Sequence, residues 1–267
     1  MGAVTCSVDA GIALITIDRP EKLNALTLQM YDDLARSFDR ARDDERVGVV
    51  VLTGAGDRAF SVGADLRESI PALAEGRFDI SHWDGAHQKH TRLYKPVIAA
   101  VNGLCLGGGF ELMLSTDLRI CSEGARFALP EVGVGVVPAG GTLTRLTRQV
   151  PYALAMELMM LGDQIGADDA FRMGLVNRVV PDGRVLAEAL EIAERLLSRS
   201  GTALEVIKSG VLHLADMPTE AAFHAEALYG QKAFASDDAE EGLAAFAAHR
   251  NAHFPTRRGL RTPAVDN

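Results

Sequence analysis

The stretch CLGGGFELML, Cys105–Leu114, decides the fold expected of this chain. Three consecutive glycines open it, and glycines at a strand-to-helix turn let the backbone pass close to a neighbour or a ligand. The apolar residues that follow predict a buried helix, yet Glu111 lies among them. A buried carboxylate has to be paired, solvated or used, because an isolated buried charge is costly. Taken alone, the stretch fits either an oxyanion-binding turn or a tightly packed helix whose N-terminus favours an acid.

The segments on either side alternate between strand and helix patterns. Short apolar or β-branched runs predict strands at 4–8, 12–18, 47–53, 97–101, 118–121, 126–128 and 174–180, the first two as a hairpin. Helical spacing predicts helices at about 28–43, 108–115, 153–161, 167–173, 182–198, 202–214, 218–235 and 237–249, the first capped by Thr27. NGLCLGGG (102–109) and GVGVVPAGG (133–141) are expected to be turns, and Arg67–Tyr94 a mixed helical segment.

This order of elements predicts an α/β fold with a core over 1–198 and a helical region over 199–267. The chain has 267 residues, 48% of them hydrophobic, which is enough for a large core. A net charge of −9 argues against general nucleic-acid or anionic-membrane binding. No apolar run approaches the ~20 residues of a membrane span. Three cysteines without CxxC spacing and an N-terminus without a secretory pattern lead us to expect a cytoplasmic protein.

Two acids in apolar surroundings are the strongest candidates for chemistry. Glu111 follows the glycine turn, and Glu131 follows Pro130 in FALPEVGVG. The proline fixes the local backbone and so presents the next side chain rigidly. Carboxylates that face one cavity can hold a water and act as base and acid. For Glu131 alone, a solvated loop acid stays an open alternative.

Backbone N–H groups are the candidate partners of these acids. The first N–H groups of a helix have no intrahelical acceptor, so those after the glycine turn can stabilise a developing oxyanion. In AFSVGADL (59–66), Gly63 permits unusual backbone geometry and Ala64 offers a second N–H donor. Asp65 is equally suited to cap a following helix.

Other side chains carry weaker signals. His82, His87 and His90 lie in the polar segment, the last two at i, i+3. No HExxH motif accompanies them, so a solvated helix face is favoured over a metal site. The sequence also lacks a GxSxG nucleophile elbow, a P-loop and a dinucleotide fingerprint.

An ordered set of motifs resembles the crotonase superfamily, also called the enoyl-CoA hydratase/isomerase superfamily. The motifs are IDRPEKLNAL, VVVLTGAGDRAFSVGADL, KPVIAAVNGLCLGGGFEL, ARFALPEVGVGVVP, GLVNRVV and SDDAEEGLAAF, and together they cover roughly residues 4–255. Each is weak alone, but in this order they are specific. The resemblance implies a spiral of β-β-α units with a helical C-terminal trimerisation region, assembled as a homotrimer or a dimer of trimers.

The resemblance also implies a substrate and a site. The substrate is an acyl-CoA thioester, with CoA arriving as part of it and with no separate cofactor or metal. The oxyanion hole falls on the N–H groups of Ala64 and Gly108, and the two hydratase glutamates fall on Glu111 and Glu131. The residues implied to line the CoA site are Lys22, Leu23, Ala25, Val62, Gly63, Asp65, Leu66, Arg67 and Gly107. Because both glutamates are present, the resemblance favours a hydro-lyase of fatty acid metabolism that adds water syn to a trans-2-enoyl-CoA.

Departures from the family pattern keep other activities open. PAGGTLTRL, Pro138–Leu146, stands where many hydratases have PGAGGTQRL, and the shifted glycine pair affects the acyl pocket. His249 and Ala252 replace the lysine and proline of a common C-terminal pattern, KRxPxF. A carnitinyl-CoA dehydratase-like activity and a Δ3,Δ2-enoyl-CoA isomerase stay open within the family. A non-catalytic role also stays open, namely that of a crotonase-fold binding protein, including one that binds RNA.

Overall fold

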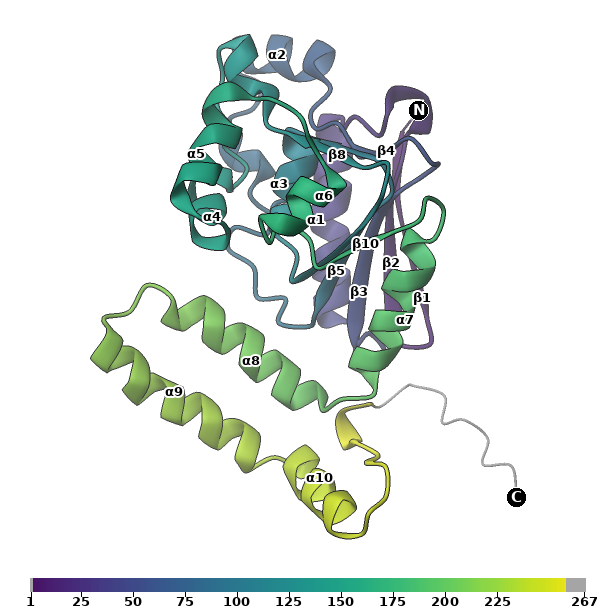
Figure 1. Ribbon diagram of the computed structural model, residues 1–267, viewed down its shortest axis with the longest axis vertical. Helices are drawn as coiled ribbons and strands as arrows, with labels where there is room; N and C mark the ends of the chain where they lie inside the picture. The colour runs from purple at the N-terminus through teal and green to yellow at the C-terminus, as the bar shows by residue number, and fades with distance from the viewer. Residues whose placement is uncertain (1, 258–267) are drawn as a thin grey trace.

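Two β-sheets and ten α-helices make up the computed structural model, which describes residues 2–257 (Figure 1). The larger sheet has the order β1-β2-β3-β5-β7-β10, and the smaller sheet has the order β4-β6-β8-β9. The large-sheet strands are β1 (Ala3–Asp9), β2 (Ile12–Asp18), β3 (Val49–Gly54), β5 (Val97–Val101), β7 (Leu118–Ser122) and β10 (Arg178–Val180). The small-sheet strands are β4 (Ala59–Ser61), β6 (Leu104–Leu106), β8 (Arg126–Ala128) and β9 (Ile165–Gly166).

Helix α1 packs on one face of the larger sheet and helix α7 on the other. The ten helices are α1 (Leu28–Asp43), α2 (Leu66–Ala74), α3 (Gly108–Leu114), α4 (Thr142–Gln149), α5 (Tyr152–Leu161), α6 (Ala167–Arg172), α7 (Val185–Leu197), α8 (Gly201–Leu214), α9 (Thr219–Phe234) and α10 (Asp237–Ala247). Along β3, Val50 and Leu52 join the core that contains α1, whereas Val49 and Val51 face α7. This alternation follows from the pleat of a strand that is buried on both faces.

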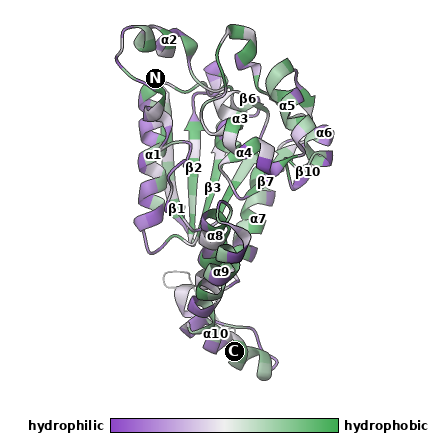
Figure 2. Cartoon of the chain, turned by 90° about the vertical axis from the view of Figure 1, so that its left-hand side faces the viewer, coloured by the Kyte–Doolittle hydropathy of each residue, from purple (hydrophilic) through white to green (hydrophobic). Residues whose placement is uncertain are grey.

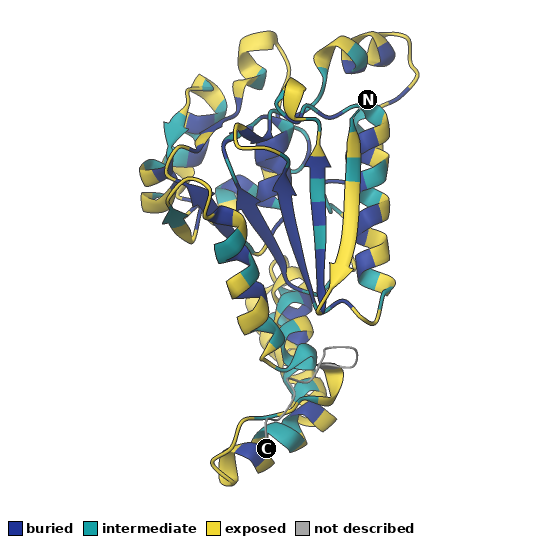
Figure 3. Ribbon diagram, turned by 90° about the vertical axis from the view of Figure 1, so that its right-hand side faces the viewer, coloured by how far each residue is buried: buried dark blue, intermediate teal, exposed yellow. Residues whose placement is uncertain are grey.

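The predicted hairpin and buried strands are confirmed. β1 pairs with β2 antiparallel across a turn in which Ala10 and Gly11 both have positive φ, 45° and 86°. β2, β3, β5 and β7 then run parallel, and every residue of β3 and β5 is buried. β1 is the exposed edge of the sheet (Figure 3). The predicted first helix is also confirmed, since the Thr27 side chain accepts a hydrogen bond from the Met30 N–H.

The structure differs from the sequence-based expectations in three places. Residues 102–109, expected to be a turn, contain the short strand β6, which pairs with both β4 and β8. Helix α4 was not predicted, and it begins after Gly141, whose φ is +115°. The mixed helical segment is helical only in α2 and in the 3₁₀ turn Ile80–Trp83, and turns fill much of the rest.

The C-terminal helices form a layer of their own below the sheets (Figures 1 and 2). α7 ends at Leu197, and α8 begins at Gly201 after Ser200, whose side chain accepts from the Ala203 N–H. The division of the chain into domains at 198/199 stays a prediction, and residues 258–267 lie outside the described residues. Large apolar side chains on this layer face solvent, namely Ile207, Val211, Phe223, Leu228, Phe234, Leu243 and Phe246. Within residues 2–257, no helix is long and apolar enough to cross a membrane.

Candidate active site

The carboxyl ends of three parallel strands in the smaller sheet gather the candidate residues. β6 lies between β4 and β8 and is parallel to both, with Cys105 opposite Ser61 on one side and Phe127 on the other. Ala64 follows β4, Gly108 begins the helix after β6, and Glu131 follows β8. Parallel strands bring their carboxyl ends to one edge, where loops commonly build a ligand site.

The Ala64 and Gly108 amides meet at this edge because glycines let the two backbones touch. Gly63 and Gly107 have φ values of +84° and +51°, which side chains rarely tolerate. A methyl group placed on Gly63 would lie 2.5 Å from the Gly108 nitrogen, and one placed on Gly108 would lie 3.6 Å from the Ala64 nitrogen. Within residues 2–257, neither the Ala64 nor the Gly108 N–H donates a hydrogen bond to a backbone carbonyl. Two free donors therefore lie close together.

Glu111 is held by one of its oxygens. The side chain comes from the first turn of α3, and the residue is 4% exposed. Oε1 accepts hydrogen bonds from the Gly140 N–H at 2.6 Å and from Thr142 Oγ1 at 3.0 Å. Burial and then the charge of Glu131 raise the pKa of Glu111 to about 7, against the smaller lowering effect of its hydrogen bonds. This carboxyl can exchange a proton near neutral pH.

Glu131 faces the same edge from the 3₁₀ turn Pro130–Val134. Its Oε1 lies 3.0 Å from a methyl group placed on Gly107, the residue next to the Gly108 amide. Its Oε2 is buried and has no hydrogen-bond partner. Burial raises the pKa of Glu131 as well. The structure thus brings together the two glutamates and the two amides that the sequence analysis singled out.

Two residues that the sequence analysis did not assign to the site also lie here. Tyr31, on α1, has its hydroxyl oxygen 2.8 Å from a methyl group placed on Gly108. Burial, and then the charges of Glu111 and Glu131, raise the pKa of Tyr31 far above its ordinary value. His87 is fully buried, with Nε2 2.7 Å from a methyl group placed on Gly140.

The prediction of a solvated helix face is therefore wrong for His87, although His82 and His90 are exposed. Its ring packs inside the chain, 5.6 Å from the ring of Tyr31, in a stretch of turns. Polar neighbours in the sequence gave no sign of this burial. Among residues 2–257, no group of three or more His, Cys, Asp or Glu side chains is arranged to hold a metal ion.

Apart from Gly107, which precedes α3, the residues implied for CoA binding lie on two segments that are joined at the same edge, one after β2 and one running from β4 into α2. The Val62 N–H donates to the Leu23 carbonyl, and the Leu26 N–H donates to the Gly63 carbonyl. Three of the side chains are exposed, namely Lys22, Leu66 and Arg67. Asp65 caps α2 and pairs with Arg19 at 2.8 Å, so its carboxylate is engaged within the protein. Contact of these residues with CoA stays a prediction.

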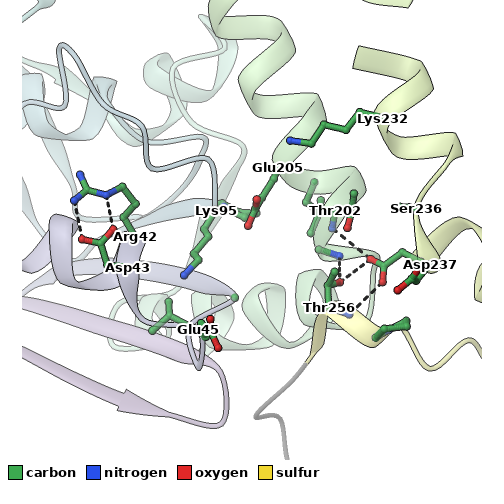
Figure 4. A pocket seen from close by; sticks show the side chains of 17 residues that line it. Arg42, Asp43, Glu45, Lys95, Thr202, Glu205, Lys232, Ser236, Asp237 and Thr256 are labelled. Atoms are coloured by element: carbon green, nitrogen blue, oxygen red, sulfur yellow. Dashed lines mark hydrogen bonds and ion pairs between the residues drawn. The ribbon is translucent and has the colours of Figure 1, made fainter. Parts of the chain in front are cut away.

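A separate cavity of about 650 Å³ lies between the core and the C-terminal helices (Figure 4). Lys95 on its wall donates hydrogen bonds to the Ala41 and Asp44 carbonyls, and Thr256 bonds to Asp238 on the far side. Neither glutamate of the candidate site lines it. These hydrogen bonds lie within the core on one side of the cavity and within the C-terminal region on the other.

Comparisons with known proteins agree with this geometry. The enoyl-CoA hydratase/isomerase family model matches residues 7–257. Enoyl-CoA hydratase EchA19 of Mycobacterium tuberculosis is 37% identical over 249 residues, covering 91% of this chain and 93% of that protein. Carnitinyl-CoA dehydratase of Escherichia coli K12 is 38% identical over 251 residues, covering 91% and 94%.

Solved structures give the same family. The crystal structure of enoyl-CoA hydratase from Bacillus anthracis superposes with a TM-score of 0.89 at 31% identity and covers 94% of this chain and 98% of that one. The structure of an enoyl-CoA hydratase/isomerase from Mycobacterium abscessus gives 0.87 at 36% identity, covering 95% and 99%. With its sheets, its glycine turn and its two glutamates arranged as described, the chain belongs to the enoyl-CoA hydratase/isomerase family and has the crotonase fold.

Proposed function

We propose that the protein catalyses the reversible addition of water to a trans-2-enoyl-CoA thioester. The observation that carries the proposal is the pair of glutamates, Glu111 buried and Glu131 half-buried, beside two amide N–H groups that have no backbone acceptor. The thioester oxygen lies between the Ala64 and Gly108 amides, which stabilise the negative charge that develops on it in the transition state. One such donor contributes ~3 kcal/mol to the barrier in enzymes where it has been removed.

The two glutamates divide the proton transfers between them. Glu111, held through Oε1, takes a proton from water as the water oxygen bonds to C3. Glu131, which enters the reaction protonated, delivers its proton to C2, so the double bond is consumed and one water is added. The proton taken up by Glu111 then returns to Glu131 through solvent, which restores the starting state. In the reverse direction the roles exchange. Protein, water and the CoA thioester supply every atom of this reaction.

Isosteric variants test the assignment. Glu111→Gln and Glu131→Gln are each expected to lower kcat for hydration of crotonyl-CoA by at least ~100-fold, because each removes a proton-transfer group while keeping its shape. Loss of the conjugated-enoyl absorbance measures the rate, and circular dichroism checks the fold. Glu157→Gln, a change at an exposed carboxyl on α5, is the matched control. Near wild-type hydration by either site variant contradicts the proposal.

A second activity has support from the comparisons. The carnitinyl-CoA dehydratase of E. coli K12 is as similar to this chain as the enoyl-CoA hydratases are. Dehydration of a 3-hydroxyacyl-CoA uses the same two carboxyl groups in reverse, so the site geometry suits both. Comparing kcat/KM for crotonyl-CoA and crotonobetainyl-CoA decides between them, and a 3-enoyl-CoA in the same panel tests the isomerase alternative.

A further inference from the structure

Two buried side chains beside the glutamates have polar atoms that the proposed hydration leaves unused. Tyr31 is 1% exposed and His87 is 0% exposed. Neither the Tyr31 hydroxyl oxygen nor His87 Nε2 has a hydrogen-bond partner. Such atoms are uncommon in folded proteins, because an unpaired buried polar group is costly. They indicate a partner that the folded chain does not itself supply.

Both atoms border the place where the acyl group would lie. A methyl group on Gly108 would touch the Tyr31 hydroxyl at 2.8 Å and would lie 3.6 Å from the Ala64 nitrogen. A methyl group on Gly140 would lie 2.6 Å from Glu111 Oε2 and 2.7 Å from His87 Nε2. Tyr31 thus adjoins the amide pair, and His87 adjoins the carboxyl proposed to act at C3.

The two atoms have complementary hydrogen-bonding roles. His87 Nδ1 lies 3.0 Å from the Trp83 carbonyl, which can only accept, so Nδ1 carries the ring hydrogen. Burial lowers the pKa of His87 to about 4, against a smaller raising effect of the hydrogen bond to the Trp83 carbonyl and with further lowering by the charges of Arg145 and Lys89. The ring is therefore neutral at pH 7, and Nε2 is an acceptor. Because Tyr31 keeps its proton, its hydroxyl is available as a donor.

The attacking water and a plain alkyl chain leave this pair unsatisfied. The attacking water donates to ionised Glu111 and directs a lone pair at C3, while Glu131 is the protonated acid, so this water cannot pair with both the Tyr31 hydroxyl and His87 Nε2. An alkyl chain would exclude solvent and leave both atoms unpaired, which is how enzymes reject substrates that lack a hydroxyl. A carboxylate would be repelled by the two glutamates, and Arg145 nearby is already bonded to the His87 and Gln88 carbonyls.

We propose that the acyl pocket takes an acyl group with a hydroxyl on C4, which accepts from Tyr31 and donates to His87 Nε2. A hydroxyl is both donor and acceptor, and it is neutral, so it matches the pair and tolerates the adjacent carboxyls. Its position follows from the approach of His87 Nε2 and Glu111 Oε2, the carboxyl proposed to act at C3, to the same point beside Gly140, and to that extent it rests on the proposed function.

Binding of unreactive saturated thioesters tests the pocket separately from turnover. Isothermal titration with 4-hydroxybutyryl-CoA and butyryl-CoA should show at least ~10-fold tighter binding of the hydroxylated thioester by the wild-type protein. Tyr31→Phe and His87→Phe keep an aromatic ring and should each reduce that ratio toward 1. Tyr152→Phe, at a tyrosine that is 69% exposed, is the matched control and should keep the ratio. Equal binding of both thioesters by the wild-type protein, or an unchanged ratio in both ring variants, overturns the proposal.

Turnover of the unsaturated pair separates the two proposals. Tighter binding of 4-hydroxybutyryl-CoA without hydration of crotonyl-CoA or 4-hydroxycrotonyl-CoA supports the hydroxyl pocket and contradicts the hydratase assignment. Hydration of both unsaturated thioesters with equal kcat/KM supports the hydratase assignment and contradicts the hydroxyl pocket. A kcat/KM for 4-hydroxycrotonyl-CoA that exceeds the crotonyl-CoA value, and falls selectively in Tyr31→Phe, supports both.

Discussion

The shared environment of Glu111 and Glu131 makes the proposed reaction dependent on pH. Glu111 acts ionised in hydration, and its pKa is raised to about 7 by burial and then by the charge of Glu131. We expect kcat for hydration to rise as pH increases through about 7 and to fall at higher pH, where Glu131 loses the proton that it delivers to C2. In Glu131→Gln the rising limb of the residual kcat profile should shift to lower pH, because the charge that helps to raise the pKa of Glu111 is gone. Matched profiles of kcat between pH 5 and 9 measure this, and an identical midpoint in both proteins contradicts it.

The same carboxyl lowers stability at alkaline pH. Because the pKa of Glu111 rises from 4.5 to about 7 on folding, the native state binds more protons than the unfolded chain between those values. The contribution of Glu111 to the stability of the folded protein is therefore most favourable below pH ~4.5 and is lost as pH rises through about 7. Glu111→Gln should stabilise the protein at pH 8 by on the order of 1–3 kcal/mol and change little at pH 5. Thermal melts at both pH values check this, and a gain of equal size at each contradicts it.

Sequence reasoning could locate the acids but not their neighbours. Glu111 and Glu131 stand out because each interrupts an apolar stretch. Tyr31 lies at a core-facing position of a helix, where a sequence pattern predicts only that an aromatic ring packs in the core. His87 lies in a polar stretch whose burial depends on tertiary contacts, including the hydrogen bond from Arg145. A local sequence pattern does not contain such tertiary contacts, although these contacts determine where Tyr31 and His87 lie.

At the level of elements, helix α4 fixes the turn that carries His87. The guanidinium of Arg145 donates to the His87 carbonyl at 2.7 Å and to the Gln88 carbonyl at 2.8 Å. Arg145→Met should lower the free energy of unfolding by ~2–4 kcal/mol, since it leaves both carbonyls unpaired. Arg148→Met, on the same helix, removes only an exposed pair with Asp216 and should cost less than ~1 kcal/mol. Urea denaturation of both variants compares them, and equal losses contradict the assigned role.

The long buried elements were predictable, and the short ones were not. β3 and β5 are apolar throughout, and α1 shows both helical spacing and a threonine cap. β6 has three residues, and its pairing with β4 and β8 decides its conformation. The sequence of α4, TLTRLTRQ, has a β-branched threonine at three of its eight positions, which weakens the local helix signal, and Leu146 and Thr142 on its buried side stabilise it through packing.

At the level of the whole molecule, the C-terminal layer exposes apolar side chains that need a partner surface. Phe223, Phe234 and Phe246 are 67%, 81% and 82% exposed. We expect a trimer or a dimer of trimers, with a mass of three or six 28.5 kDa chains by light scattering. Phe234→Glu should shift the mass toward the single chain, whereas Glu226→Gln on the same helix should not. A wild-type protein that stays monomeric at micromolar concentration contradicts this expectation.

The placement of His87 has a consequence for how the protein can diverge. The amides and glutamates follow strands of the smaller sheet, whereas His87 lies in the stretch between α2 and β5, outside both sheets. Exchanging that stretch for the corresponding loop of a relative leaves the strand ends in place. Under the two proposals made above, the groups that carry out the reaction and one of the two groups that recognise the substrate thus lie on separate segments of the chain, so one can change while the other is kept.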